Sequence, residues 1–196
     1  MRKGFLSILY KGLTFVIVSI WILVALFFGY LCLMKTVYPL KYREEIIESA
    51  SVFGIEPSLI CAFIKVESDF NPNAVSNKKA IGLMQITSST GEYIANLNGV
   101  KEYNLKDAKT NIKFGCFYIN YLSVKFSDIN TVICAYNAGE GKVSSWLKNK
   151  EYSQDGTTLK SIPFTETKEY LTKIKKTFEK YKKLYGNILD KRQKIE

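Results

Sequence analysis

The stretch Pro57–Ile86 reads PSLICAFIKVESDFNPNAVSNKKAIGLMQI, and the rest of the chain is organised around it. Its first half is an apolar run that predicts a helix, and Pro57 stands where a first-turn proline is tolerated. The run meets a lone acid, Glu67, and the polar segment Asp69–Asn73 then predicts the end of the helix. The stretch therefore places one carboxyl group at the C-terminal end of a helix, ahead of a loop that ends in Gly82-Leu83-Met84-Gln85.

The position of Glu67 predicts a raised proton affinity. The C-terminal end of a helix is partly negative and disfavours a second negative charge. Apolar neighbours such as Phe63, Val66 and Phe70 add a desolvation penalty, so the pKa of Glu67 is expected to be raised. A carboxylic acid that stays protonated near neutral pH can donate its proton to a glycosidic oxygen. A solvated glutamate at a helix end is the simpler alternative, and the residues around Glu67 alone leave it open.

Composition narrows the class of chemistry. With 196 residues, 47% of them apolar, the chain suits one membrane segment and one compact domain. It has no histidine, which excludes a serine–histidine triad and a histidine-ligated zinc site. The cysteines show no CxxC spacing and are expected to be small buried residues rather than a disulfide framework. They are Cys32, Cys61, Cys116 and Cys134.

The amino-terminal part predicts a membrane anchor. A short basic segment, residues 1–12, precedes the uncharged run Leu13–Met34. These 22 residues would span about 33 Å as a helix, enough to cross the hydrocarbon core. The run is longer than a signal-peptide core and lacks a small-x-small cleavage site, so residues 13–34 are expected to be an uncleaved signal anchor. Basic residues balance on its two sides, so charge does not set its orientation.

Residues 41–187 read as one mainly α domain, because apolar residues recur every three or four positions and no convincing strand pattern appears. Gly54 is expected to end the first helix, while Asp128 and Thr165 are expected to cap later ones. Helices are expected near Tyr42–Phe53, Pro57–Glu67, Thr87–Asn96, Ala108–Phe126, Asp128–Tyr136, Val143–Leu147 and Thr165–Tyr185. A tight bend is expected at 137–141 and a polar surface loop at 150–161.

Further polar residues are candidates for a site. Glu166 falls in the first turn of the last helix, where the helix dipole favours an ionised carboxylate; ordinary helix-end charge complementarity explains it equally well. Tyr136 and Asn137 precede the glycine bend and are able to bind sugar hydroxyls and N-acetyl groups. Glycines expected to let the backbone approach a ligand closely are Gly82, Gly139 and Gly141.

The last helix and the charged tail, residues 188–196, hold most of the positive charge. The segment Lys168–Glu196 has ten basic and four acidic residues, against a net charge of +10 for the chain. Such a face can bind an anionic wall polymer, a membrane surface or nucleic acid, and a solvated lysine-rich helix is the simpler alternative. No nucleic-acid-binding module is recognisable, so no nucleic acid is expected as a partner.

Four motifs occur in order along the chain: Glu67-Ser68-x-Phe70-x-Pro72-x-Ala74-x-Ser76, Gly82-Leu83-Met84-Gln85-Ile86, Ala135-Tyr136-Asn137-Ala138-Gly139-x-Gly141-x-Val143 and Glu166-Thr167-x-x-Tyr170. Together they resemble the motifs of the soluble-type (SLT) lytic transglycosylases, and the resemblance covers roughly residues 46–185. Asn111-Ile112-x-x-Gly115-x-x-Tyr118 resembles the segment of that family between the second and third motifs. Ser88 departs from the pattern, because many relatives have proline there.

The resemblance implies a goose-lysozyme-like helical domain that cleaves peptidoglycan between N-acetylmuramic acid and N-acetylglucosamine, leaving a 1,6-anhydro sugar. It makes Glu67 the catalytic acid and base. The residues that it implies in substrate binding or in orienting Glu67 are Ser76, Gln85, Tyr136, Asn137 and Glu166. Met84 and Tyr170 are expected to be groove or packing residues. No cofactor and no metal are expected.

The expected partners are peptidoglycan glycan strands and the cell membrane, reached through residues 13–34, with the catalytic domain on the extracytoplasmic face where peptidoglycan lies. Two alternatives stay open. One is a muramidase that hydrolyses the same bond with water, and the other is a glycan-binding module of a secretion, conjugation or spore apparatus without catalysis. Protein partners, oligomeric state and exo or endo cleavage are not indicated by the sequence.

Overall fold

The computed structural model describes residues 2–189, with side chains from Tyr10 onward, so most of the tail at 188–196 lies outside the described residues. The chain divides into two compact units, Met1–Pro39 and Leu40–Glu196. Within residues 2–189 there are eight helices and no strand, which confirms the mainly α prediction. Val75, Ile81 and Ile86 form only isolated antiparallel bridges.

The first unit is one helix, α1 (Arg2–Val37). Within its segment Tyr10–Val37, a stretch of 18 residues reaches a mean hydropathy of 2.7, and none of that stretch is buried. The helix is therefore long and apolar enough to cross a membrane, and it contains the predicted segment 13–34. Cys32 is exposed on this helix, contrary to the expectation of a buried cysteine, whereas Cys61, Cys116 and Cys134 of the second unit are buried as expected.

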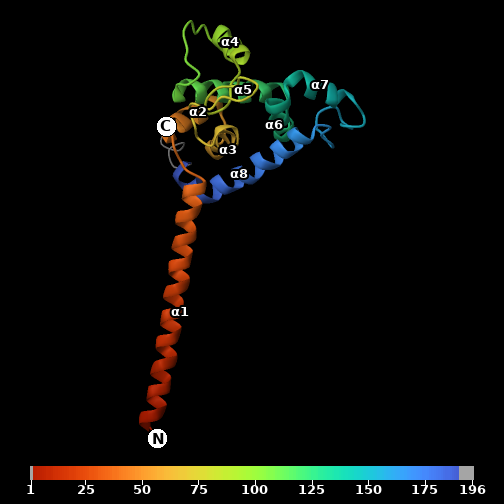
Figure 1. Cartoon of the computed structure of the whole chain (residues 1–196). Coiled ribbons are helices and arrows are strands. Elements are labelled where there is room, and N and C mark those ends of the chain that lie inside the picture. Colours follow the sequence, from red (N-terminus) through yellow and green to blue (C-terminus); the bar gives the residue numbers. More distant parts are fainter. Residues whose placement is uncertain (1, 190–196) are drawn as a thin grey trace. The chain divides into compact units, whose positions relative to one another are not determined.

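The second unit contains the remaining helices (Figure 1). They are α2 (Arg43–Phe53), α3 (Pro57–Ser68), α4 (Ser88–Leu97), α5 (Ala108–Lys125), α6 (Ile129–Ala138), α7 (Glu140–Lys148) and α8 (Thr165–Leu189). Gly54 ends α2 in the left-handed conformation, with φ of 64°. The side chains of Thr87, Asp107 and Asp128 accept hydrogen bonds from backbone N–H groups in the first turns of α4, α5 and α6. The expected helices and the Gly54 and Asp128 ends are thus confirmed.

The core of this unit forms where α3 packs against α8, as Figure 1 shows. Ile60, Phe63 and Ile64 of α3 are fully buried. The buried face of α8 includes Ile174 and Tyr181, which are fully buried as well. Helix α2 lies against α5, and α6 contacts both α5 and α8. The apolar half of the opening stretch is therefore the centre of the domain, and this burial fixes the position of Glu67 at the end of α3.

Two local expectations are corrected by the structure. The bend expected over 137–141 is a single residue, Gly139, with φ of 90° and ψ of 141° between α6 and α7. One glycine suffices because this φ is open to it without steric cost. Helix α8 begins at Thr165 itself, and the carbonyl of Phe164 accepts the first helical hydrogen bond, from the N–H of Lys168 at 3.0 Å. Phe164, rather than Thr165, thus occupies the cap position.

Candidate active site

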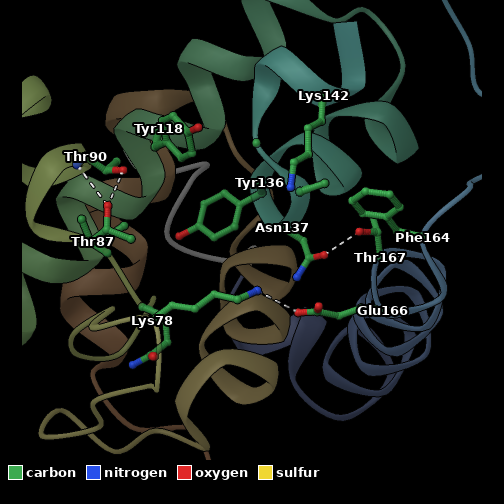
Figure 2. Close-up of a pocket in the computed structure, with 14 residues that line it drawn as sticks. Lys78, Thr87, Thr90, Tyr118, Tyr136, Asn137, Lys142, Phe164, Glu166 and Thr167 are labelled. Carbon is green, nitrogen blue, oxygen red and sulfur yellow. Dashed lines mark hydrogen bonds and ion pairs between the residues drawn. The ribbon is translucent and has the colours of Figure 1, made fainter. Parts of the chain in front are cut away.

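A groove passes over the C-terminal end of α3. It consists of two adjoining cavities of about 410 and 360 Å³, and Figure 2 shows the lining of the larger one. The residues that line both are Lys78, Gln85, Thr87, Tyr136, Asn137 and Glu166. The smaller cavity is lined by all six residues predicted for the site: Glu67, Ser76, Gln85, Tyr136, Asn137 and Glu166. Four segments that are separate in the sequence therefore meet in one groove.

Glu67 is half-buried near the end of α3. Desolvation raises the pKa of its carboxyl group to about 7, and a hydrogen bond from the hydroxyl of Tyr170 opposes part of that rise. The expected direction of the shift is confirmed, and desolvation is its main cause. The backbone turns away sharply after this point, because Asp69 and Phe70 have φ of 52° and 60°. Phe70 is thereby folded into the core, where it is 1% exposed.

Two tyrosines enclose this carboxyl group. Tyr170 of α8 is buried, as a packing residue should be, but its hydroxyl also donates a hydrogen bond to Oε1 of Glu67, which the sequence did not predict. The hydroxyl of Tyr136 donates to the carbonyl of Met84 at 2.7 Å. The ring of Phe63 lies 4.8 Å from that of Tyr136 and 6.4 Å from that of Tyr170, measured between centroids. Burial and the charge of Glu67 raise the pKa of both tyrosines, so both remain phenolic donors.

The loop that bears Met84 and Gln85 is held from beneath by Asn111 of α5. This side chain accepts a hydrogen bond from the N–H of Met84 at 2.7 Å, and it donates to the carbonyls of Ile81 at 2.9 Å and Leu105 at 2.7 Å. Asn111 is fully buried, and three of its hydrogen-bonding positions are used. Sequence reasoning did not place it in the site, although a polar amide within an apolar helical pattern was a usable signal.

Gly82 was predicted to let the backbone approach a ligand closely, but the structure gives it a different role. A Cβ at this residue would lie 2.3 Å from Nδ2 of Asn111 and 2.4 Å from the carbonyl oxygen of Leu105. Its φ of 82° also favours glycine. Gly82 therefore allows close packing of the loop on α5 rather than close approach of a ligand. Gly139 does line the larger cavity, whereas Gly141 lines neither cavity.

Gln85 and Ser76 shape the loop wall of the groove. The amide nitrogen of Gln85 donates to the carbonyls of Ala74 at 3.2 Å and Gly82 at 2.9 Å, while its backbone has φ of 50°. The hydroxyl of Ser76, an exposed residue, accepts a hydrogen bond from the N–H of Ala80 at 3.1 Å. Both polar side chains thus stabilise the loop that they belong to, in addition to lining the cavity.

The opposite wall comes from α6 and the start of α8. The hydroxyl of Thr167 donates to Oδ1 of Asn137 at 2.8 Å, which orients the amide of Asn137 and leaves its N–H groups as donors at the groove. Glu166 is 71% exposed and pairs with Lys78 at 3.4 Å. Figure 2 shows Lys78 extending from the loop on one side of the groove to Glu166 on the other. An exposed ion pair of this kind is weak and opens readily.

The carboxylates that line the two cavities are those of Glu67 and Glu166. Among residues 2–189, no three cysteine or acidic side chains gather closely enough to hold a metal ion. The arrangement can offer a proton from Glu67, neutral hydrogen-bond donors and acceptors around it, and aromatic rings from Tyr118, Tyr136 and Phe164. These groups are suited to a hydroxyl-rich ligand, and Lys78, Lys142 and Glu166 add charged side chains to the larger cavity.

Comparison with known proteins agrees with this arrangement. The family model described as "Transglycosylase SLT domain" matches residues 44–158. The chain is 33% identical over 144 residues to a soluble lytic murein transglycosylase of Escherichia coli, covering 70% of this chain and 22% of that protein. It is 31% identical over 169 residues to a membrane-bound lytic murein transglycosylase C of Yersinia pestis, covering 73% of this chain and 47% of that protein. The chain thus spans less than half the length of either relative.

The solved structures that resemble this chain are also those of lytic transglycosylases. The 70-kDa soluble lytic transglycosylase of Escherichia coli in complex with bulgecin A superposes with a TM-score of 0.69 at 28% identity, covering 78% of this chain and 26% of that one. An inactive mutant of the lytic transglycosylase Slt of Pseudomonas aeruginosa gives 0.65 at 28% identity, covering 75% and 25%. The family match covers more than half of the sequence, and its residues include most of the groove. This chain belongs to the transglycosylase SLT domain family.

Proposed function

We propose that this protein is a membrane-anchored lytic transglycosylase that cleaves the β-1,4 bond between N-acetylmuramic acid and N-acetylglucosamine in peptidoglycan without consuming water, for wall remodelling or local wall opening. The observation that carries the proposal is the state of Glu67. Its carboxyl group is half-buried at the groove, and desolvation raises its pKa to about 7, so a substantial fraction is protonated near neutral pH.

Glu67 would act twice on this proposal. It first donates its proton to the glycosidic oxygen as the bond to the anomeric carbon breaks. The resulting carboxylate then accepts the proton of the muramoyl 6-hydroxyl as that oxygen bonds to the same anomeric carbon. The product is a 1,6-anhydro sugar, and Glu67 ends protonated as it began. Tyr170 would position the carboxyl group through its hydrogen bond.

The surroundings of Glu67 favour this route over one with a carboxylate nucleophile. A retaining glycosidase needs two carboxyl groups about 5–5.5 Å apart, one of them a nucleophile. The other carboxylate of this groove, Glu166, is exposed and paired with Lys78. An internal nucleophile supplied by the substrate removes the need for the second carboxylate. Ser76, Gln85, Tyr136, Asn137 and Glu166 would bind the glycan or orient Glu67.

The relatives support the assignment. The soluble and membrane-bound proteins that this chain resembles are named as lytic murein transglycosylases. The Pseudomonas aeruginosa structure is named as an inactive mutant in which one glutamate is replaced by glutamine. We propose that Glu67 is the corresponding essential carboxyl group. We also propose that α1 crosses the membrane once and holds the second unit on the extracytoplasmic side, where peptidoglycan lies.

Digestion of purified peptidoglycan, followed by mass analysis of the products, tests this function. Muropeptides with 1,6-anhydro ends, which lack one water relative to reducing ends, are expected. Reducing ends alone would make the protein a muramidase. Binding of glycan without release of soluble muropeptides would make it a binding module instead.

A further inference from the structure

The charge of the second unit is concentrated on one surface. Residues 40–165 contain 14 basic and 13 acidic residues, so this part of the chain is almost neutral. The outward side of α8 from 168 to 183 has seven lysines and two glutamates, a net charge of +5 within 16 residues. All nine of these side chains are exposed. We call the lysines the basic face: Lys168, Lys173, Lys175, Lys176, Lys180, Lys182 and Lys183.

Among the described residues, only one lysine of the basic face has an acidic partner. Lys182 pairs with Glu56 at 3.4 Å and lies over the ring of Phe178 at 5.4 Å from its centroid. The other six lysines take part in none of the ion pairs found among the described residues. Elsewhere in the unit, lysines such as Lys65, Lys109 and Lys125 each have an acidic partner within 4 Å. The basic face therefore presents a net positive potential to solvent.

Docking through the lysines of the basic face from Lys173 onward would leave the groove uncovered. Only the first turn of α8 reaches the groove, through Glu166 and Thr167. Further along, the helix turns its buried side, with Ile174 and Tyr181, toward α3 and the core. The lysines after the first turn lie on the other side of the helix. A partner bound there would contact neither Glu67 nor the walls that surround it.

The linker restricts which partner can meet the basic face. Five residues, 38–42, separate the end of α1 at Val37 from the start of α2 at Arg43. A chain of this length spans at most about 18 Å. If α1 crosses the membrane as proposed above, the second unit is kept permanently at the bilayer surface at high effective concentration. An electrostatic attraction that is weak for each lysine then suffices to hold one face of the unit against the surface.

We propose that the basic face of α8 docks on the anionic phospholipid headgroups of the membrane in which α1 is anchored, and so sets the orientation of the groove toward the wall. This inference rests on the proposed anchor. Clusters of lysine near a membrane are attracted to anionic lipid, and the attraction falls off within a Debye length of about 8 Å at physiological salt.

Lysine reactivity in the full-length protein tests the docking. The protein is placed in nanodiscs of phosphatidylcholine alone or of phosphatidylcholine with phosphatidylglycerol, and the acetylation rate of each lysine is followed by mass spectrometry. Lys173, Lys176, Lys180 and Lys183 are expected to react several-fold more slowly in the anionic discs, and high salt should abolish the difference. Lys101, Lys106 and Lys150, exposed lysines elsewhere in the unit, are the internal controls and should react equally in both. Equal rates for the basic face in both discs would overturn the proposal.

A variant pair supplies the second arm. Lys176→Gln/Lys180→Gln/Lys183→Gln should remove the protection of Lys173, whereas Lys101→Gln/Lys106→Gln/Lys113→Gln, with the same change of charge, should keep it. Adding soluble poly(glycerol phosphate) to phosphatidylcholine discs separates lipid from wall polymer, and protection that appears only with the polymer would overturn the membrane assignment. Release of muropeptides by the same preparations in detergent reports the proposed function separately, so loss of docking and loss of enzyme activity are distinguishable.

Discussion

Two carboxyl groups of the groove stand at opposite kinds of helix end. Glu67 lies at the C-terminal end of α3, half-buried and hydrogen-bonded by a buried tyrosine. Glu166 lies in the first turn of α8, 71% exposed and paired with Lys78. The helix dipole disfavours a negative charge at Glu67 and favours one at Glu166. The burial of Glu67 reinforces this difference. The same chemical group is thus half-buried with a raised pKa in one place, and exposed and ion-paired in the other.

The largest effect should come from removing the donor. Glu67→Gln keeps the shape of the side chain but cannot transfer a proton, so the rate of muropeptide release is expected to fall by about 10²–10⁴-fold or more. Glu166→Gln, the matched control, should retain most of the turnover and act mainly on KM. Comparable losses in turnover for the two variants would show that the two carboxyl groups are not divided in role as we propose.

The next effect concerns the loop that lies beside Glu67. Asn111→Ala leaves the N–H of Met84 and the carbonyls of Ile81 and Leu105 without their partner, so the free energy of unfolding is expected to fall by about 3–5 kcal/mol. Asn120→Ala on the same helix removes one exposed hydrogen bond, to the carbonyl of Phe53, and should cost less than about 1 kcal/mol. Thermal unfolding of the full-length variants in detergent measures both. A similar loss for both variants would contradict a supporting role for Asn111.

Ionisation of Glu67 should also lower the free energy of unfolding of the protein as pH rises. Its pKa is raised in the folded state from 4.5 to about 7, so folding favours the protonated form. The stability from the neutral carboxyl group is complete below the unfolded-state pKa and is lost as pH rises from about 4.5 through about 7. Glu67→Gln is therefore expected to gain up to about 3 kcal/mol over the native protein between pH 4 and pH 8, measured by chemical denaturation. Glu166→Gln should change the free energy of unfolding by less than about 1 kcal/mol at either pH.

The smallest effect should come from Tyr170→Phe. The tyrosine hydroxyl bonds to the carboxyl of Glu67 and lowers its pKa, so its removal should raise that pKa above about 7. The high-pH limb of kcat/KM, where the general acid loses its proton, should therefore move to higher pH. Tyr136→Phe is the matched control, because the hydroxyl that it removes donates to the carbonyl of Met84 rather than to Glu67. The high-pH limb of kcat/KM should therefore stay in place in this variant. A limb that stays in place in Tyr170→Phe would assign Tyr170 to packing alone.

Sequence periodicity predicted the helices of the second unit well, because it depends on neighbours three or four residues apart. It failed at the bend between α6 and α7, which was expected to span residues 137–141 and is formed by Gly139 alone. It also failed at the start of α8, where Phe164 takes the cap position expected for Thr165. The role predicted for Gly82 was also wrong, since the side chain that occupies the place of a Cβ at Gly82 is that of Asn111, which lies on α5.

What the sequence determined by itself was local: the helix that begins at Pro57, the acid at its end, the anchor-length apolar run and the charge excess of the last helix. Contacts between distant residues were decided only by tertiary structure. Tyr170 meets Glu67 across 103 positions, and Lys78 meets Glu166 across 88. Such pairs depend on how α3 and α8 pack side by side, and that register is fixed by the fit of whole buried faces rather than by any short motif. The sequence therefore predicted the direction in which the pKa of Glu67 shifts, whereas the fold decided the size of that shift.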